Sequence, residues 1–551
     1  MKGIDMKLAA YFQKLRENRR LTDLLVALPL FLLSLGVILY YIIGPSEGYF
    51  HSDCTDSILW ANAALESGKI LAEDFYYAAI LPFGSFIWMV PAVALLGLSM
   101  PAQILSMSIF AVLFCAVLVF FFRSMKWGWK WTAAAVFSTV LILSGSEKLR
   151  EIMWEHTIYY SLGILLVFLL LGLIFRVLDS PWEKGKRARL VVWSVLLFAV
   201  CLGCGTDSFQ VLAITVVPAL GALALYAFFD KETPLISWNN GRKYVIAVIV
   251  VLGSFAGLAV LSVITQFGKI DAYYENSYSL WSSVSSWHEN AGKFFEHYFS
   301  LLGIDAPASQ LFSFTSVLTM IKLAGALLLL VCPVVLLFQY RKIRDRYTKI
   351  ALLAHVLLTA VILFGYICGM LSIVEWRLTP FVGSSVVTTF LCVKWLICEN
   401  EIVGKRIGGL IMALILAFSL VNVKTIVSIP ADYGRDDPIY VTLEELEARD
   451  LTYGYATFWN AGRATILSDS KVKVRNINLS TSGISPDQYQ SSERWYEDKE
   501  GQETYFLMLT ESEYATFKMT DIYKEVLAYQ ALLSTFQSGD YYILVFNQNL
   551  F

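Results

Sequence analysis

Residues 21–44, LTDLLVALPLFLLSLGVILYYIIG, decide the fold. Asp23 is the charged residue of this run, and most of the other residues are Leu, Ile or Val. An apolar run of about 20 residues crosses the ~30 Å hydrocarbon layer of a bilayer as an α-helix. The run lacks the period-two alternation of membrane-barrel strands, and lipid requires backbone amides to be bonded within the segment. It therefore predicts a transmembrane helix.

Similar apolar runs fill most of the chain. Of its 551 residues, 57% are hydrophobic and 16% are charged, whereas soluble proteins carry about 25% charged residues. The net charge of −2 does not favour a nucleic-acid partner. We therefore predict an all-α polytopic membrane domain of about eleven spans that lies in the lipid bilayer. The further spans are expected near residues 101–123, 130–145, 157–177, 188–204, 207–229, 244–265, 311–339, 350–372, 378–397 and 407–427.

Basic residues indicate the orientation of these spans. Residues 1–20 carry six Lys or Arg residues, and positive charge is retained in the cytoplasm. We expect this N-terminal segment to be cytoplasmic, in a multi-pass protein of the cell membrane. Alternation through eleven spans then places every basic spacer in the cytoplasm and the C-terminal region outside. These spacers are 123–130, 184–189, 231–243, 341–349 and 405–406.

The apolar stretch at 79–98 decides the count. It contains Pro82, Gly84, Pro91 and Gly97, which weaken a spanning helix. We expect it to be re-entrant or to lie on the membrane surface. A crossing here would give twelve spans and would move the later basic spacers outside.

Acidic residues gather where the first span ends, in the sequence GYFHSDCTDS at 48–57. Asp53 and Asp56 precede a short amphipathic helix, so either could cap its free amides. Capping accounts for one acid and leaves the gathering of His51, Asp53 and Asp56 unexplained. We predict that the two acids are catalytic and that His51 binds substrate, together with Tyr76 and Tyr77. For the two tyrosines, an interfacial aromatic belt is the alternative.

A second acidic segment lies at 144–160, in another outer loop. Glu155 and His156 border an apolar run, where ionisable groups are costly and usually face a cavity. Such acids serve as bases or bind divalent metals through oxygen. We therefore add Glu155 and His156 to the catalytic residues. Helical pairing such as Glu147 with Arg150 is the alternative for the rest of the segment. If the site holds a metal, we expect Mg or Mn, with Asp53 and Glu155 as its candidate ligands.

Two further outer segments bear on function. Residues 266–310 are rich in aromatic residues and predict one or two helices on the bilayer surface. Arg377 lies at an outer boundary, and its forked donors suit phosphate oxygens. Snorkelling to the interface is the alternative for Arg377. We assign donor-phosphate binding to Arg377, with Arg150 as a second candidate.

The chain changes character after Pro430. Strand-like pieces such as DYYILVFN (540–547) alternate there with helix-like pieces such as VTLEELEAR (441–449). This pattern predicts a small extracytoplasmic α/β domain at 430–551, following a transmembrane domain at 21–429.

The layout resembles the polytopic glycosyltransferases of structural class C that use lipid-phosphate sugars, in a bacterial branch. Protein O-mannosyltransferases, aminoarabinose transferases and oligosaccharyltransferase catalytic subunits belong there. The resemblance rests on Asp53 soon after the first span, the proline-containing stretch YYAAILPFGSFIWMVPAVALLGLS (76–99), the segment Glu147 to His156, and the closing domain. It departs at Cys54, where the mannosyltransferases have Glu, and at Pro82-Phe83, where the aminoarabinose type has paired prolines.

The resemblance implies a membrane enzyme that transfers a sugar from a polyprenyl-phosphate donor to a glycan, lipid or protein acceptor of the cell envelope. Asp53 would be the catalytic base or a metal ligand, and Asp56, Glu155 and His156 would support it. The alternatives are a transporter or flippase of lipid-linked sugars, with Asp207 as its nearest buried charge, and a cell-surface glycan polymerase or ligase.

Overall fold

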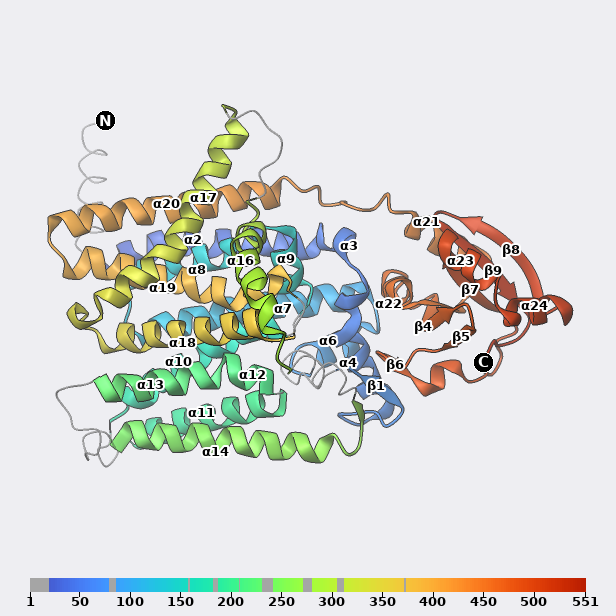
Figure 1. The fold of residues 1–551 in the computed structure, drawn as a ribbon, viewed down its shortest axis with the longest axis horizontal. Helices are drawn as coiled ribbons and strands as arrows, with labels where there is room; N and C mark the ends of the chain where they lie inside the picture. The colour runs from blue at the N-terminus through green and yellow to red at the C-terminus, as the bar shows by residue number, and fades with distance from the viewer. Residues whose placement is uncertain are drawn as a thin grey trace, which may run out of the picture.

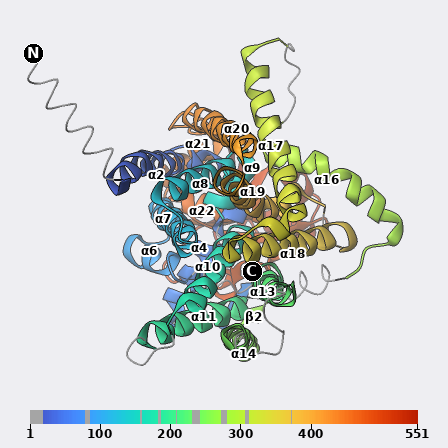
Figure 2. The same cartoon turned by 90° about the vertical axis from the view of Figure 1, so that its left-hand side faces the viewer.

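The computed structural model describes residues 19–551 apart from 79–85, 157–158, 182–186, 208, 230–240, 271–279, 305–311 and 371–372. Long helices run side by side in one bundle, and a small α/β unit closes one end of it (Figure 1). Figure 2 shows the bundle turned by 90°, with its other end toward the viewer.

The polytopic prediction is confirmed. Within the described ranges, ten helical segments are long and apolar enough to cross a membrane. The eleventh predicted span is the shorter apolar helix α8 (Trp129–Ile142), most of which is buried. The ten segments are α2 (Arg19–Ile43), α7 (Met100–Ser124), α10 (Tyr159–Asp179), α11 (Arg187–Asp207), α12 with α13 (Phe209–Ile214, Val216–Phe229), α14 (Gly241–Ile264), α17 (Phe314–Phe338), α18 (Arg346–Cys368), η5 with α19 (Glu375–Leu378, Thr379–Glu399) and α20 (Ile402–Val427).

The stretch at 79–98 forms no long helix in its described part. Helix α6 (Met89–Leu96) has 8 residues, about 12 Å of rise, which is far less than a bilayer requires. It packs against α7 and against α4 (Asp56–Ser67). Helix α4 lies in the loop between α2 and α7, which is named the first outer loop below because the alternation of spans predicts that it faces outward. Residues 79–85 of the prediction lie outside the described residues.

Side-chain contacts identify the end of the bundle that carries the basic spacers. Lys126 Nζ lies 2.9 Å from Asp179 Oδ2, and Arg346 forms an ion pair with the same carboxylate. Lys130 lies 3.6 Å from Asp23 near the start of α2. These residues come from three basic or N-terminal segments, so the structure brings them to one end, as the predicted alternation of spans requires.

Small residues hold α11 and α14 in close contact. A Cβ placed on Gly257 would lie 2.2 Å from Leu202 O, and one on Gly205 would lie 2.4 Å from Ser254 O. Backbones of membrane helices approach this closely only where side chains are absent.

We expect Gly257→Leu to lower the stability of the protein in detergent by about 1–3 kcal/mol, the usual cost of overpacking a tight contact. The melting temperature of the purified chain measures this. Gly409→Leu on α20 is the matched control, because a Cβ there meets nothing within 4 Å. Equal melting temperatures for the two variants would contradict the close contact of α11 and α14.

The C-terminal α/β prediction is also confirmed. A six-stranded sheet has the order β5-β4-β3-β7-β9-β8, with β3 parallel to both β4 and β7 and the other pairs antiparallel. Helix α22 follows β3 and packs on β4, which makes a β-α-β unit. The elements are α21 (Pro438–Ala448), β3 (Tyr453–Thr457), α22 (Phe458–Leu467), β4 (Lys473–Ser480), β5 (Gly483–Pro486), η6 (Glu493–Tyr496), β7 (Tyr505–Thr510), α23 (Glu511–Phe517), α24 (Asp521–Ala528), β8 (Leu532–Ser538) and β9 (Tyr541–Phe546).

The first outer loop attaches this unit to the bundle. Strand β1 (Phe75–Tyr77) pairs with β2 (Lys269–Ile270) and with β6 (Ser491–Ser492), so two outer loops and the C-terminal unit share one small sheet. Helix α22 packs on η1 (Ser52–Thr55) so tightly that a Cβ on Gly462 would lie 2.7 Å from Thr55 Oγ1. The first outer loop is therefore held between the membrane bundle and the α/β unit.

Candidate active site

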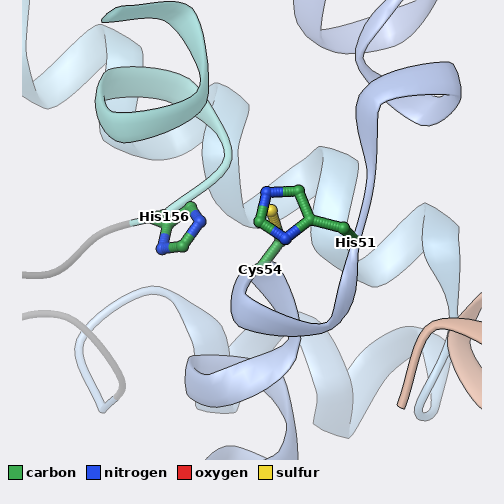
Figure 3. A group of neighbouring side chains, drawn as sticks. All are labelled: His51, Cys54 and His156. Carbon is green, nitrogen blue, oxygen red and sulfur yellow. The ribbon is translucent and has the colours of Figure 1, made fainter. Parts of the chain in front are cut away.

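Two segments that are far apart in the sequence meet at the end of the bundle next to the α/β unit. The first is the turn from α3 (Ser46–Tyr49) through η1 into α4, which carries His51, Asp53 and Asp56. The second is α9 (Glu147–Trp154) with the residues that follow it, Glu155 and His156. Figure 3 shows His51 and Cys54 of the first segment facing His156 of the second.

Glu151 joins the two histidines. Its Oε1 lies 3.3 Å from His51 Nε2 and 3.6 Å from His156 Nε2, and the imidazole rings are 5.6 Å apart. Lys148 Nζ, one helical turn earlier, lies 2.5 Å from the other carboxylate oxygen. Burial would raise the pKa of Glu151, but the hydrogen bond from His51 and the hydrogen bond and charge of Lys148 lower it to about 2. Glu151 is therefore ionised.

Glu155 is buried in a different environment. Its side chain is 3% exposed, accepts a short hydrogen bond from Tyr41 Oη, and lies 3.7 Å from Cys54 Sγ. Gln103 donates to its backbone oxygen at 3.0 Å. Burial raises the pKa of Glu155 to about 7, against the opposing hydrogen bond from Tyr41. A carboxyl group with this pKa can exchange a proton near neutral pH.

Asp53 is half-buried, and its carboxylate makes no hydrogen bond or ion pair with the described residues. Neither η1 nor α4 has a side-chain N-cap, so Asp53 and Asp56 are not capping residues. Burial raises the pKa of Asp53, the charges of His51 and Lys148 lower it, and Glu151 raises it again. An acid held by no other group is available to an incoming molecule.

Asp56 is the first residue of α4. Its Oδ1 is buried and has no hydrogen-bond partner. Burial and the nearby charge of Asp53 raise the pKa of Asp56 well above its usual value. Two carboxylates with raised pKa values thus lie three residues apart on η1 and α4.

The predicted cations occupy different positions. Arg150 is 4% exposed, and its guanidinium lies 5.2 Å from the Tyr41 ring and 5.7 Å from the Tyr49 ring. Arg150 is not paired with Glu147, whereas Lys148 and Glu151 of the same helix do form an ion pair at helical spacing. Arg377 lies on η5, which contacts α9. In this contact, Lys148 Nζ of α9 lies 4.8 Å from the centre of the Trp376 ring of η5. Both arginines therefore border the acidic segments, and Lys148 is a third cation there.

His51, Cys54 and His156 could hold a metal ion. Their ligand atoms all lie within 4.8 Å of one another. Both ring nitrogens of His156 are buried without a hydrogen-bond partner, and burial lowers the pKa of this histidine to about 3. Neutral imidazole and thiolate ligands suit zinc, whereas the predicted Mg or Mn would prefer oxygen ligands. The donor atoms therefore fit a zinc-type ion.

Comparison with known proteins identifies the fold. The aminoarabinose transferase ArnT of Cupriavidus metallidurans, bound to undecaprenyl phosphate, matches with a TM-score of 0.51 and 12% identity over 95% of this chain and 97% of ArnT. The chain has the class C glycosyltransferase fold. The ArnT structure without ligand matches at 0.48 and 11% identity, over 89% of this chain and 93% of ArnT. An Archaeoglobus fulgidus oligosaccharyltransferase in the apo form matches at 0.47 and 11%, over 83% of this chain and 64% of its own length. No protein-family model and no curated protein matches the sequence.

Within this class C fold, two predicted substrate residues lie apart from the acids. Tyr76 and Tyr77 belong to β1, beyond the C-terminal end of α4. Tyr77 is 2% exposed and accepts a hydrogen bond from Ala72 N, and Tyr76 donates to Glu493 of the α/β unit at 2.9 Å. Their substrate role stays a prediction, and the structure places them in the contact between the loop and the α/β unit.

Proposed function

We propose that this chain is a membrane glycosyltransferase that moves a sugar from a polyprenyl-phosphate donor to an extracytoplasmic glycan, lipid or protein acceptor. The observation that supports this most is the position of Asp53. It is an acid without a partner among the described residues, and it lies at the end of the bundle in a fold shared with ArnT. The ArnT structure holds undecaprenyl phosphate, which is a lipid-phosphate of the proposed kind.

The chemistry assigned to these residues is a single displacement. Asp53 takes the proton of the acceptor nucleophile as that atom bonds to the anomeric carbon of the sugar. The bond between this carbon and the phosphate oxygen breaks, and the electron pair leaves with the polyprenyl phosphate. Arg377 is assigned to the negative charge of the departing phosphate, with Lys148 against the neighbouring Trp376 and with Arg150 as the second candidate. Asp56, Glu155 and His156 support Asp53, and His51 contacts the substrate.

The site is also proposed to bind a divalent metal. His51, Cys54 and His156 would hold it, and Glu151 lies within reach of both histidines. A bound cation supplies positive charge, and here it would also fix η1 against α9. Asp53 and Glu155, the ligands expected from sequence, lie beside this group and do not belong to it.

The test is a transfer assay with the purified chain in liposomes. A panel of polyprenyl-phosphate sugars is supplied together with an envelope extract as acceptor. The expected result is consumption of one donor class and release of polyprenyl phosphate by the wild type, without either in Asp53→Asn. Consumption of no donor, or equal consumption by both proteins, would overturn the proposal.

A second candidate, transport of a lipid-linked sugar, has one observation in its favour. Asp207 at the end of α11 is 2% exposed, and neither of its carboxylate oxygens has a hydrogen-bond partner among the described residues. Ionisable groups buried in a bundle often mark transport pathways. The same liposomes separate the two functions, because a transporter moves the donor between leaflets without releasing polyprenyl phosphate.

The orientation is proposed from the basic end of the bundle. We place residues 1–20 in the cytoplasm, the domain at 21–429 in the membrane and the domain at 430–551 outside, because basic spacers stay in the cytoplasm. We expect Asp498→Cys to react with an impermeant maleimide on intact cells, and Lys342→Cys to react only after permeabilisation. Both positions are exposed, and Cys398→Ser removes the exposed native thiol. The reverse labelling pattern would place the acidic site in the cytoplasm.

A further inference from the structure

A cavity lies along α4, from Leu59 to Ser67. Its volume is about 590 Å³, within the usual range of about 300–1,000 Å³ for ligand sites. Leu59, Asn62, Ala63 and Glu66 line one wall, and their spacing places them on one face of α4. The opposite wall comes from the α/β unit, around the start of β4 and η6. The cavity therefore forms only where the first outer loop meets the α/β unit.

The wall of this cavity is strongly basic. Five of its lining residues are Lys or Arg, and two are acidic. Some of this charge is compensated, because Lys471 pairs with Glu447 at 3.1 Å and Arg494 pairs with Asp74 at 3.3 Å. The remaining cations have no carboxylate within 4 Å in the part of the chain that the structure describes. These are Lys473, Arg475 and Lys499.

Arg475 is the buried member of this group. It is 7% exposed, and its guanidinium lies 4.2 Å from the centre of the Trp495 ring. Its Nε is buried without a hydrogen-bond partner. Burying a cation without a counter-charge is costly, so buried cations in proteins are normally paired with an anionic group. Arg475 therefore brings to this cavity a positive charge without a counter-charge and a hydrogen-bond donor that is not used.

Lys499 also lies close to other cations of this cavity. Its side chain is half-buried and donates to Arg494 O. Burial lowers the pKa of Lys499, and the charges of Arg475 and Lys473 lower it further, while Glu497 and Glu66 oppose them. An anion between these cations would relieve their mutual repulsion.

The rest of the lining indicates which anion fits. Amide and hydroxyl groups of Asn62, Thr452 and Gln502 line the same cavity, and Tyr453 and Trp495 supply aromatic surface. Such a wall matches a molecule with many hydroxyl groups and one charged group, and the volume exceeds what a bare inorganic anion needs. We propose that this cavity binds an anionic saccharide, whose phosphate or carboxylate group contacts Arg475, Lys473 and Lys499.

The cavity is separate from the acidic site. Its wall on α4 runs from Leu59 to Ser67 and begins about one helical turn after Asp56, and neither Asp53 nor Asp56 lines it. The proposal rests on the geometry of the cavity and does not depend on sugar transfer by Asp53. A binding measurement therefore tests it without any turnover.

The experiment is isothermal titration of the full-length chain in detergent with four probes. Glucose 6-phosphate and trigalacturonate carry the two kinds of anionic group, maltotriose is the neutral saccharide, and inorganic phosphate is the anion alone. We expect at least one anionic saccharide to bind about tenfold or more tightly than maltotriose and inorganic phosphate, and to weaken with added salt. Whichever anionic probe binds identifies the charged group as phosphate or carboxylate.

Substitutions locate the binding in this cavity. Lys473→Glu and Lys499→Gln change partly or fully exposed side chains and are expected to weaken binding about tenfold each. Lys524→Gln on α24, outside the cavity, is the matched control and keeps the wild-type affinity. The proposal is overturned if neither anionic saccharide binds more tightly than the neutral one, if phosphate alone binds as tightly, or if Lys473→Glu and Lys499→Gln both bind as the control does.

Discussion

Replacing Asp53 by Asn is expected to lower the rate of sugar transfer by about 10²–10⁴-fold, the usual contribution of a general base. The amide has nearly the same shape as the carboxylate but cannot accept the proton of the acceptor. Asp53 makes no hydrogen bond or ion pair with the residues that the structure describes, so the substitution removes no contact between them. The loss should therefore appear in turnover and not in folding.

Initial rates in liposomes at equal protein content measure this effect, together with melting temperatures of both proteins. Asp432→Asn is the matched control, because Asp432 is exposed and lies in the segment that follows α20. The control is expected to transfer sugar at the wild-type rate. Asp53→Asn activity above one tenth of wild type would remove Asp53 from the role of base and would direct attention to Glu155.

The helices of the bundle could be predicted because apolar length alone selects a membrane-spanning helix. The limits of that rule appear at 207–229 and at 130–145. The span predicted at 207–229 is divided into α12 and α13 around Thr215, whose hydroxyl donates back to Val211 O. The second ends at Ile142, because the turn Ser144-Gly-Ser146 leads into α9, where Ser146 caps the helix by accepting from Leu149 N. Local polar contacts of this kind are not encoded in hydropathy.

The candidate site could be predicted only as two separate acidic segments. Sequence spacing suggested that His51, Asp53, Glu155 and His156 matter, and the structure brings these segments together. It could not show that Tyr41 bonds Glu155, because residues 114 positions apart meet only through helix packing. Tyr41 lies at the outer end of an apolar span, where a phenol needs a polar partner, and this was the available signal.

Cys54 and Glu151 were missed for a different reason. A cysteine beside an apolar run is usually a small hydrophobic residue, and Glu151 has the ordinary helical partner Lys148. The structure adds the two histidines around them, one from each outer segment. A ligand group assembled from both segments has no local spacing motif, so the sequence could not show it.

This group leads to the second large expected effect, on metal affinity. The purified chain is expected to bind one Zn²⁺ ion, and Cys54→Ser or His156→Asn should weaken that affinity by about 100-fold or more, since even residues that only orient a ligand contribute about 10–100-fold. Competition with a chelating indicator measures the dissociation constant without any need for turnover. Cys398→Ser and His288→Asn are matched controls, because both residues are exposed and outside the group.

The paired design separates a real site from adventitious binding to scattered thiols and imidazoles. Cys54 and His156 are buried, and they come from segments about 100 residues apart, so one ion that needs both must lie between η1 and α9. Metal binding should then also raise the melting temperature of the wild type, because the ion ties the loop that carries Asp53 to the loop that carries Glu155. If all four variants bind Zn²⁺ equally, the three side chains form no metal site, and the two segments are joined by direct contacts such as those of Glu151 with His51 and of Cys54 with Glu155.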